Sequence, residues 1–571
     1  MREFTLTVML ALATLAVNAK NASTPTWTKS LTTTEKAEDI NRGGAMAIDA
    51  DGNSIVTGSY TKDLEFANSY LESTATSAFI AKYDKAGKEL WAAGLSGAAT
   101  ITTVTTDTDG NIYAAGVFAD EVNILNGKGE SKATITGMAD QTSQVSGFIV
   151  KYDKDGEYVA SKVVIPQVDM VNETYGDPDL YFKPSRMLFS GDNIILSAQY
   201  TGKSELGGLT LKGQYCNKED WFYMYDIPTL GIISISKDLE NATLVVQLAA
   251  TENETYDGFA AESCNFATDG SKVYAGFVAY GSDLTLRSAN GSKQIKDLLS
   301  ETSGEETKYE HAFVLATIEG GNITDTKIYH SKIDDNLKEA KFNSIDEMAF
   351  QNGDLFLAGT FNETFPFDNS KAYKGGCDTY LACLNANDLS KSWALTSGYN
   401  EGDANKNAES VSGMAIYDDQ VQLTGWSEAT SGHKVISPLN FSVALGGTPS
   451  IMSIKDGDDA TFITSVAQNG QNTLTQSDNK QVDGAEEGTY TYSFFADGNK
   501  PTAIKQVLAG GNSISINGSV VTLAKAANVD LYSANGVLVK SAKNVSTLSL
   551  DNLASGVYVI KVGDQTMKFV K

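Results

Sequence analysis

The hydrophobic positions of this chain fall in short runs that are separated by turns rich in Asp, Gly and Asn. The clearest stretch is 45–95, where four short apolar runs are divided by a loop and by tight turns. Apolar runs of this length between turn residues predict β-strands. Four of them in succession predict a four-stranded antiparallel meander.

Weaker copies of this meander continue almost to the end of the chain. SAFIAKYDKAG at 77–87 matches SGFIVKYDKDG at 146–156 almost residue for residue, and the third unit has a weaker copy at 220–231. The turn between the first and second strands recurs seven times, and six copies pair Gly with an adjacent Asp or Asn, as tight hairpins require. Repeated four-stranded units predict an all-β fold, a β-propeller whose blades surround an axis.

The last unit ends near Asp497 without a fourth strand. The segment Trp27–Leu31 resembles the fourth-strand segments at 90–93 and 392–395, each of which contains a Trp. We therefore predict that this N-terminal strand completes the last blade and removes a free sheet edge. Seven blades are favoured, and six remain open because the seventh unit matches the others least well.

The two ends of the chain differ from the repeats. Arg2, the apolar run Leu6–Val17 and the small residue Ala19 predict a signal peptide at 1–19, too short to span a bilayer. After about residue 500 the pattern alternates with period two, which predicts a small β-sandwich at 500–571. The propeller then occupies 20–499. We expect an exported protein without a transmembrane segment, at the cell surface or extracellular.

The tail resembles the C-terminal sorting domain of the type IX (Por) secretion system of Bacteroidetes. The resemblance rests on Val529–Tyr532, Asn535–Gly536, Leu550–Leu553, Gly556–Val559 and Lys568–Lys571. The body resembles the β-propeller repeats of secreted proteins from the same bacteria, with a Gly-Asn turn, a third strand ending Lys-Tyr-Asp and a fourth-strand Trp. The resemblance implies the type IX machinery as a partner and surface attachment or release, and it implies no specific ligand.

Charge and motifs narrow the function classes. The formal net charge is −27, from 71 acidic and 44 basic residues, which disfavours binding to nucleic acid or anionic lipid. Only three histidines occur, and no GxSxG, HExxH, P-loop or GxGxxG motif is present. We name no catalytic residue and no cofactor. A carboxylate-based hydrolase or lyase remains the alternative, because a pair of Asp or Glu needs no fixed spacing.

Two further patterns have structural explanations. Asp49, Asp51 and Asn53 fit the first three ligand positions of a calcium loop, but the Gly that should follow is Ser54. We therefore prefer a hairpin turn and expect no metal. Among the cysteines, a Cys216–Cys264 disulfide stays open, whereas Cys377 and Cys383 lie too far apart along one strand to bridge.

Length variation points to a binding surface. The long segments are second-to-third connections, such as 118–146 and 280–310, and unit-to-unit connections, and in a radial meander both emerge on one face. Loop aromatics there are predicted to stack on a ligand or to pack on the loops beneath: Tyr175, Tyr181, Tyr256 and Trp426.

Charged residues at the starts of the first strands are predicted to ring the funnel mouth, or to form a satisfied ion-pair network: Arg42, Arg186, Glu262, Asp346 and Glu409. The sequence thus predicts an exported, non-catalytic binding propeller for a glycan, peptide or surface partner. A passive structural or adhesive protein is also open.

Overall fold

The structure is a computed structural model of the chain. It describes residues 25–32, 44–73, 75–139, 144–168, 179–218, 223–250, 260–281, 284–296, 298–303, 306–331, 343–362, 364–368, 377–397, 409–417, 420–429, 432–442, 462–469, 472–478, 489–496, 514–517, 520–533, 537–551, 553, 557–562 and 565–570. The signal-peptide prediction at 1–19 lies outside these residues. Every regular element in the described part is a β-strand, so the all-β prediction is confirmed. The chain divides into two compact units, one of which is Thr26–Phe494.

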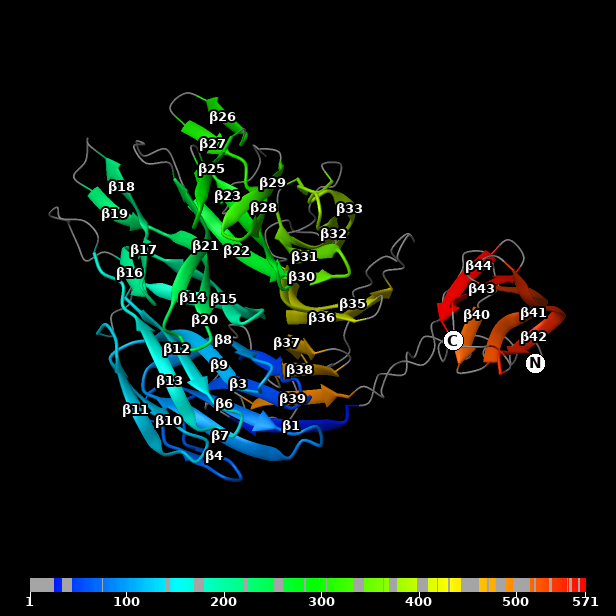
Figure 1. Cartoon of the computed structure of the whole chain (residues 1–571), viewed down its shortest axis with the longest axis horizontal. Coiled ribbons are helices and arrows are strands. Elements are labelled where there is room, and N and C mark those ends of the chain that lie inside the picture. Colours follow the sequence, from blue (N-terminus) through cyan, green and yellow to red (C-terminus); the bar gives the residue numbers. More distant parts are fainter. Residues whose placement is uncertain are drawn as a thin grey trace. The chain divides into compact units, whose positions relative to one another are not determined.

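The unit Thr26–Phe494 contains seven sheets of three to six antiparallel strands, which follow one another around a ring (Figure 1). The first sheet contains β2 (Met46–Ile48), β3 (Ser54–Tyr60), β6 (Ser77–Tyr83) and β7 (Glu89–Ser96). The second contains β8 (Ala99–Thr106), β9 (Ile112–Phe118), β12 (Ser146–Tyr152) and β13 (Tyr158–Val164). The third contains β14 (Phe182–Ser190), β15 (Asn193–Tyr200), β20 (Thr229–Ser236) and β21 (Ala242–Ala250).

The remaining four sheets continue this order. The fourth contains β22 (Ala260–Thr268), β23 (Lys272–Tyr280), β28 (Ala312–Glu319) and β29 (Asn322–Tyr329). The fifth contains β30 (Glu347–Gln351), β31 (Asp354–Phe361), β32 (Asp378–Asn385) and β33 (Lys391–Ser397). The sixth contains β34 (Glu409–Tyr417), β35 (Gln420–Ala429) and β36 (Gly432–Ser442), and the seventh β37 (Phe462–Asn469), β38 (Asn472–Asp478), β39 (Thr489–Phe495) and β1 (Trp27–Thr32).

The innermost strands hold the ring together. Strands β37, β2, β8 and β14 contact one another in succession, as do β22, β30, β34 and β37, while β22 meets the third sheet through β15 and β20. This radial arrangement of four-stranded meanders is a β-propeller, as the repeats predict. Taking each sheet as a blade gives seven, the favoured number, which itself stays a prediction.

Stacking explains why the third strands are apolar along their whole length. All seven residues of β6 are buried, and Phe79, Ile80 and Ala81 are fully buried. A sheet covered on both faces buries consecutive side chains, whereas a sheet with one wet face would alternate. The first two sheets accordingly share one apolar core, which includes Ile80, Trp91 and Phe148.

The N-terminal strand closes the ring as predicted. Strand β1 pairs antiparallel with β39, with Trp27 opposite Phe494 and Thr32 opposite Thr489. The Trp27 ring lies on Gly87, in the third-to-fourth turn of the first sheet, so closely that a Cβ there would stand 2.6 Å from the ring. Trp91 of β7 lies in the same way on Gly156 of the second sheet. The fourth-strand Trp is therefore a repeated contact between neighbouring sheets.

Several connections that the sequence suggested were loops contain strands. The hairpin β10 (Glu121–Leu125) and β11 (Ser131–Thr136) leaves the second sheet and pairs with β7 of the first. The hairpin β24 (Leu284–Ser288) and β25 (Gly291–Ile295) leaves the fourth sheet and pairs with β21 of the third. Each therefore extends the outer edge of the preceding sheet, where unpaired backbone groups find partners.

The other hairpins stand outside the large sheets. They are β4 (Leu64–Glu65) with β5 (Tyr70–Leu71), β16 (Lys203–Leu206) with β17 (Leu209–Lys212), β18 (Gln214–Lys218) with β19 (Tyr223–Ile227), and β26 (Ser300–Ser303) with β27 (Glu306–Tyr309). The predicted third strand at 220–231 was placed too early, because β19 belongs to a hairpin and the third strand is β20. Both apolar runs, now β19 and β20, are bounded by turn residues, so the sequence did not show which of them was the third strand.

The C-terminal unit has its own core. Strand β41 (Val520–Ser533) pairs with β40 (Ile514–Asn517), β42 (Leu538–Ser549) and β43 (Val557–Val562), and β43 pairs with β44 (Gln565–Val570). Alternate residues such as Val529 and Leu531 are fully buried, as the period of two predicts. Hydrogen bonds join the five strands in one sheet, with register shifts along β41, so the sandwich itself stays a prediction.

Candidate functional site

The meander gives each sheet two ends with different chemistry. First-to-second and third-to-fourth turns share one face of the propeller, which we call the turn face. Second-to-third and sheet-to-sheet connections emerge on the opposite face, the connection face. The candidate site depends on which face has side chains left for a ligand.

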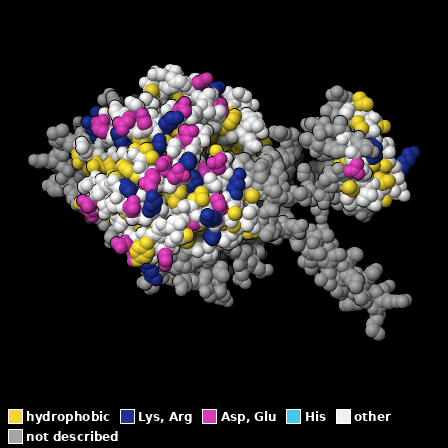
Figure 2. Space-filling view, turned by 60° about the horizontal axis from the view of Figure 1, so that its bottom comes forward, with side chains coloured by type: hydrophobic (Ala, Val, Ile, Leu, Met, Phe, Trp, Pro, Cys, Tyr) yellow, Lys and Arg dark blue, Asp and Glu magenta, His cyan; other side chains and the backbone are white. Residues whose placement is uncertain are grey.

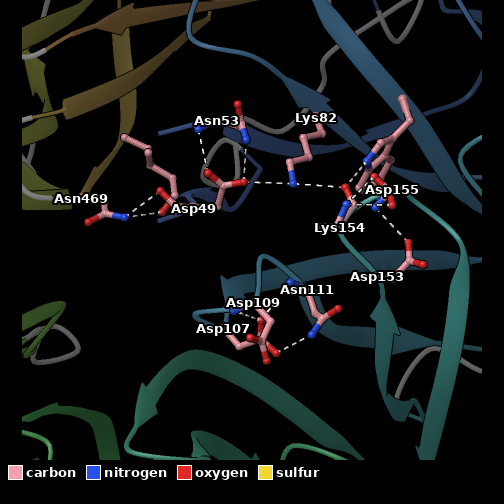
Figure 3. Close-up of polar contacts among 12 residues, drawn as sticks. Asp49, Asn53, Lys82, Asp107, Asp109, Asn111, Asp153, Lys154, Asp155 and Asn469 are labelled. Carbon is pink, nitrogen blue, oxygen red and sulfur yellow. Dashed lines mark hydrogen bonds and ion pairs between the residues drawn. The ribbon is translucent and has the colours of Figure 1, made fainter. Parts of the chain in front are cut away.

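On the turn face, Asp49 is the centre of a buried network (Figure 3). Its carboxylate accepts hydrogen bonds from the Asn53 backbone N–H at 2.8 Å and from the Asn53 side-chain amide at 2.9 Å. It also pairs with the Lys82 ammonium at 3.0 Å, and the two side chains are 1% and 3% exposed. Gly52 has a positive φ of 79°. The hairpin-turn interpretation of this acidic segment is thus confirmed.

The second sheet repeats the network around Asp107. One oxygen of this carboxylate accepts the N–H groups of Asp109 and Asn111. The other accepts the Asn111 amide at 2.7 Å and the Tyr113 hydroxyl at 3.2 Å. Desolvation by burial raises the pKa of Tyr113, and the neighbouring carboxylates raise it further. These turn carboxylates already have donors within the protein.

The same networks link neighbouring sheets. The Lys154 carbonyl, in the third-to-fourth turn of the second sheet, accepts hydrogen bonds from Lys82 at 3.2 Å and from the Trp91 indole at 3.1 Å. The Lys237 carbonyl, in the equivalent turn of the third sheet, accepts from Tyr113 at 3.0 Å and from Lys151 at 3.1 Å. Side chains on the turn face therefore hold neighbouring sheets together, and we call these inter-sheet contacts clasps.

On the connection face, Arg186 makes the most extended contact. It lies on the innermost strand of the third sheet, and its guanidinium binds the Glu347 carboxylate at 2.5 Å and the Met348 carbonyl at 2.8 Å, both on the innermost strand of the fifth. The Arg186 and Glu347 side chains are 22% and 20% exposed. Arg186 thus bridges two sheets that are not neighbours in the ring. This contact matches the ion-pair alternative that the sequence left open.

Asp346 lies next to this bridge in the chain. Its carboxylate accepts the Ser344 hydroxyl at 3.0 Å, and its carbonyl accepts the Asn265 side-chain amide of the fourth sheet. Glu347, the first residue of β30, was not predicted, because the prediction for this strand start fell on its neighbour Asp346. Arg186 therefore binds Glu347, which was not predicted, and this contact brings it close to Asp346, which was.

The other predicted funnel residues are placed less completely. Glu262 occupies a register shift in β22, between Ala261 and Ser263. Glu409 begins β34, where its backbone is opposite Ser427. Of these two residues only the backbone is described, and Arg42 lies outside the described residues.

The predicted loop aromatics divide in the same way. Tyr181 is buried, the Lys183 ammonium lies 4.1 Å from its ring centre, and burial raises its pKa to about 12. It therefore fits the packing alternative rather than an exposed stacking platform. Trp426 lies on β35 with its backbone described, whereas Tyr175 and Tyr256 fall outside the described residues.

A third group on the connection face was not predicted. Glu310, just before β28, is a fully buried carboxylate, and its Oε1 lies 2.7 Å from Nδ1 of His330, just after β29. His311 stacks on Tyr280 beside it, with ring centres 4.5 Å apart. His311 and His330 are 19 residues apart in the sequence, and this spacing did not indicate that they lie close together.

Metal ligands and thiols add no further site in the described part of the chain. The described residues contain no group of three or more His, Cys, Asp or Glu arranged to hold a metal ion. Cys264, Cys377 and Cys383 are free thiols, so the Cys216–Cys264 bridge left open by the sequence is not formed. No described helix is long and apolar enough to cross a membrane.

Surface charge on the propeller is mixed. Figure 2 shows acidic and basic side chains interspersed over the face in view, without a large area of one sign. The negative net charge is therefore not gathered into a single patch on that face. This distribution agrees with a role of the charge in solubility.

Comparisons with known proteins give weak similarities. No family model matches the chain. An uncharacterized WD repeat-containing protein, L264 of Acanthamoeba polyphaga mimivirus, is 32% identical over 125 residues, which are 19% of this chain and 9% of that protein. The match thus spans less than a tenth of the relative's length.

Similar solved structures include the Dos1 propeller, with a TM-score of 0.37 and 10% identity over 82% of this chain and 94% of that one. A member of the duf4221 family from Bacteroides vulgatus has a TM-score of 0.30 and 9% identity over 83% and 97%. At these values no activity is transferred to this chain.

Proposed function

We propose that the protein is an exported, non-catalytic propeller that binds a protein, peptide or glycan through its connection face. The observation that carries this proposal is the difference between the two faces. The turn face is committed to clasps between sheets, in which buried carboxylates such as Asp49 and Asp107 are satisfied internally. The connection face carries hairpins that stand outside the sheets, and binding sites usually lie on such segments over a rigid scaffold.

The connection face also carries exposed charge. Glu301 on β26 is exposed. Figure 1 shows β18, β19, β26 and β27 projecting from the ring. Extended segments of this kind suit recognition of a partner larger than a small molecule, since they offer separated contacts rather than one enclosed pocket.

The carboxylates near the propeller axis give less support to the alternative, a carboxylate-based hydrolase or lyase. The Glu347 carboxylate is bound by Arg186, and the Asp346 carboxylate accepts the Ser344 hydroxyl. A catalytic pair needs one carboxyl group available to protonate a leaving group. These contacts favour a structural role for both acids.

The address of the protein is part of the same proposal. The apolar N-terminal run and the tail motifs, Gly556–Val559 and Lys568–Lys571 among them, support export through the type IX machinery. This machinery is the proposed partner of the C-terminal unit, while the propeller supplies the recognition surface. The protein would then act at the cell surface or outside the cell.

Binding arrays with charge-reversal variants test the proposal. The mature protein is applied to glycan and peptide arrays, and hits are re-measured with Glu301→Lys. This variant should lose binding about tenfold or more, which is roughly 1.4 kcal/mol. Asp155→Lys on the turn face, where the Asp155 side chain is 71% exposed, is the matched control and should bind as wild type does. Loss of binding only in the Asp155→Lys variant would place the binding site on the turn face and contradict the proposal.

A further inference from the structure

The hairpin β26–β27 is held at its base by a buried carboxylate. Leu299 precedes the hairpin and Glu310 follows it. The Glu310 backbone N–H donates to the Leu299 carbonyl at 3.0 Å, and the Leu299 N–H donates to Oε1 of Glu310 at 2.6 Å. Both ends of the hairpin are therefore joined through one residue.

The Glu310 carboxyl group is unevenly satisfied. Its Oε1 also contacts Nδ1 of His330, while its Oε2 is buried and has no hydrogen-bond partner among the described residues. The side chain is 0% exposed, so bulk water does not reach it. Burying a charge costs much more than burying a neutral polar group. Protonation of Glu310 therefore removes the cost of burying a charge at the base of the hairpin.

The electrostatics agree with this geometry. Burial raises the pKa of Glu310, while His330 and the N–H groups of Leu299 and Ser331 lower it in part. A carboxyl group whose pKa is raised in the fold stabilises the fold at acidic pH, and this stabilisation is lost as pH rises through the raised pKa. The hairpin base should thus be firmest in mild acid.

Other ionisable groups surround the pair. The hairpin carries Glu301, Glu306, Lys308 and Tyr309, strand β23 ends with Tyr280, and His311 follows Glu310 directly. Among the described residues, His330 is the charged group that acts on Glu310 electrostatically. Because the His330 side chain lowers the pKa of Glu310, removing it should favour the protonated form of the Glu310 carboxyl group.

We propose that Glu310 and His330 make β26–β27 a pH-responsive arm of the connection face, firmly held when Glu310 carries a proton and loosened when it ionises. The arm itself follows from these contacts alone, and its effect on a ligand rests on the proposed function. An exported protein meets changes in external pH directly. Such an arm would make recognition of the partner stronger in mild acid than at neutral or alkaline pH.

Hydrogen exchange of the mature full-length protein tests the arm without any ligand. Protection of peptides covering 298–310, corrected for the intrinsic pH dependence of exchange, should fall several-fold between about pH 5 and pH 8. In Glu310→Gln, whose carbonyl still accepts from Leu299 and His330, protection should stay high at every pH. In His330→Gln, the fall should move to higher pH. Glu301→Gln, in the same hairpin, is the matched control and should keep the wild-type profile.

Two results would overturn the arm. One is wild-type protection of 298–310 that is flat or increases with pH. The other is a Glu310→Gln variant whose profile matches wild type. The binding arrays address the proposed function separately, because they can fail to show a ligand while the exchange profile remains as expected.

Discussion

Lys82 shows how single residues connect the sheets. Its ammonium is buried between the Asp49 carboxylate of its own sheet and the Lys154 carbonyl of the next (Figure 3). A buried ion pair adds little net stability relative to an apolar pair, but breaking it leaves one charge without compensation. The pair therefore fixes how the first two sheets meet.

Asp49→Ala should lower the apparent free energy of unfolding by about 3–5 kcal/mol, because Lys82 is left buried with a single carbonyl partner. Urea unfolding monitored by tryptophan fluorescence measures this change. Asp155→Ala is the control: the residue is exposed on the same face, and its effect should stay within about 0.5 kcal/mol. Equal, small effects of both substitutions would contradict the clasp.

The role of a single residue could be predicted where its neighbours in the sequence determine that role. Asp49 and Asn53 were correctly interpreted as turn residues, since a tight hairpin needs these side chains within a few positions. Glu347 and Glu310 were missed because their partners, Arg186 and His330, come from distant parts of the sequence. Long-range pairing of this kind leaves no spacing in the sequence.

At the scale of elements, the fourth-strand Trp packs on the turn glycine of the next sheet, and this contact is repeated. Gly87 has a positive φ of 78° and faces Trp27, and Gly156 has a φ of 86° and faces Trp91. Positive φ favours glycine, and the ring leaves no room for a Cβ. Because Trp27 belongs to β1, the same contact seals the ring.

Gly87→Ala should destabilise the propeller more than Gly270→Ala does. Both glycines have positive φ, but no atom lies within 4 Å of a Cβ at Gly270. Backbone strain of about 1–2 kcal/mol is common to both variants, and the contact with Trp27 adds about 1–3 kcal/mol for Gly87→Ala. Thermal unfolding of both proteins measures the difference. Identical melting temperatures would show that Trp27 does not seal the ring through Gly87.

Strand type and order were largely predictable, whereas excursions between strands were not. The pairing of β1 with β39 followed from the likeness of Trp27–Leu31 to other fourth strands. The pairings of β10 with β7 and of β24 with β21 were not foreseen. Each joins only a few residues to the edge of a preceding sheet, and such short contacts are set by tertiary packing rather than by local pattern.

At the scale of the whole molecule, the two units differ in charge. The segment from Phe495 to Lys571 contains eight lysines and four aspartates, whereas the whole chain has a net charge of −27. The acidic residues are thus concentrated in the propeller part of the sequence. This division agrees with the separate roles that we propose, recognition for the propeller and sorting for the tail.

Deleting Gly556–Lys571 should trap the protein in the periplasm, because the deletion removes β43 and β44 together with the closing residues of the proposed sorting motif. Cell fractionation with surface proteolysis measures the location. Deleting only Gln565–Lys571 is a milder second variant. Normal surface display of both deletion proteins would refute the sorting role of the tail.

The most direct test of the connection face is a ligand footprint by hydrogen exchange. With a ligand found on the arrays, the peptides covering 298–310 should gain protection, while the turn-face peptides 49–53, 107–111 and 153–157 should exchange as in the free protein. Protection confined to the turn-face peptides would contradict the account.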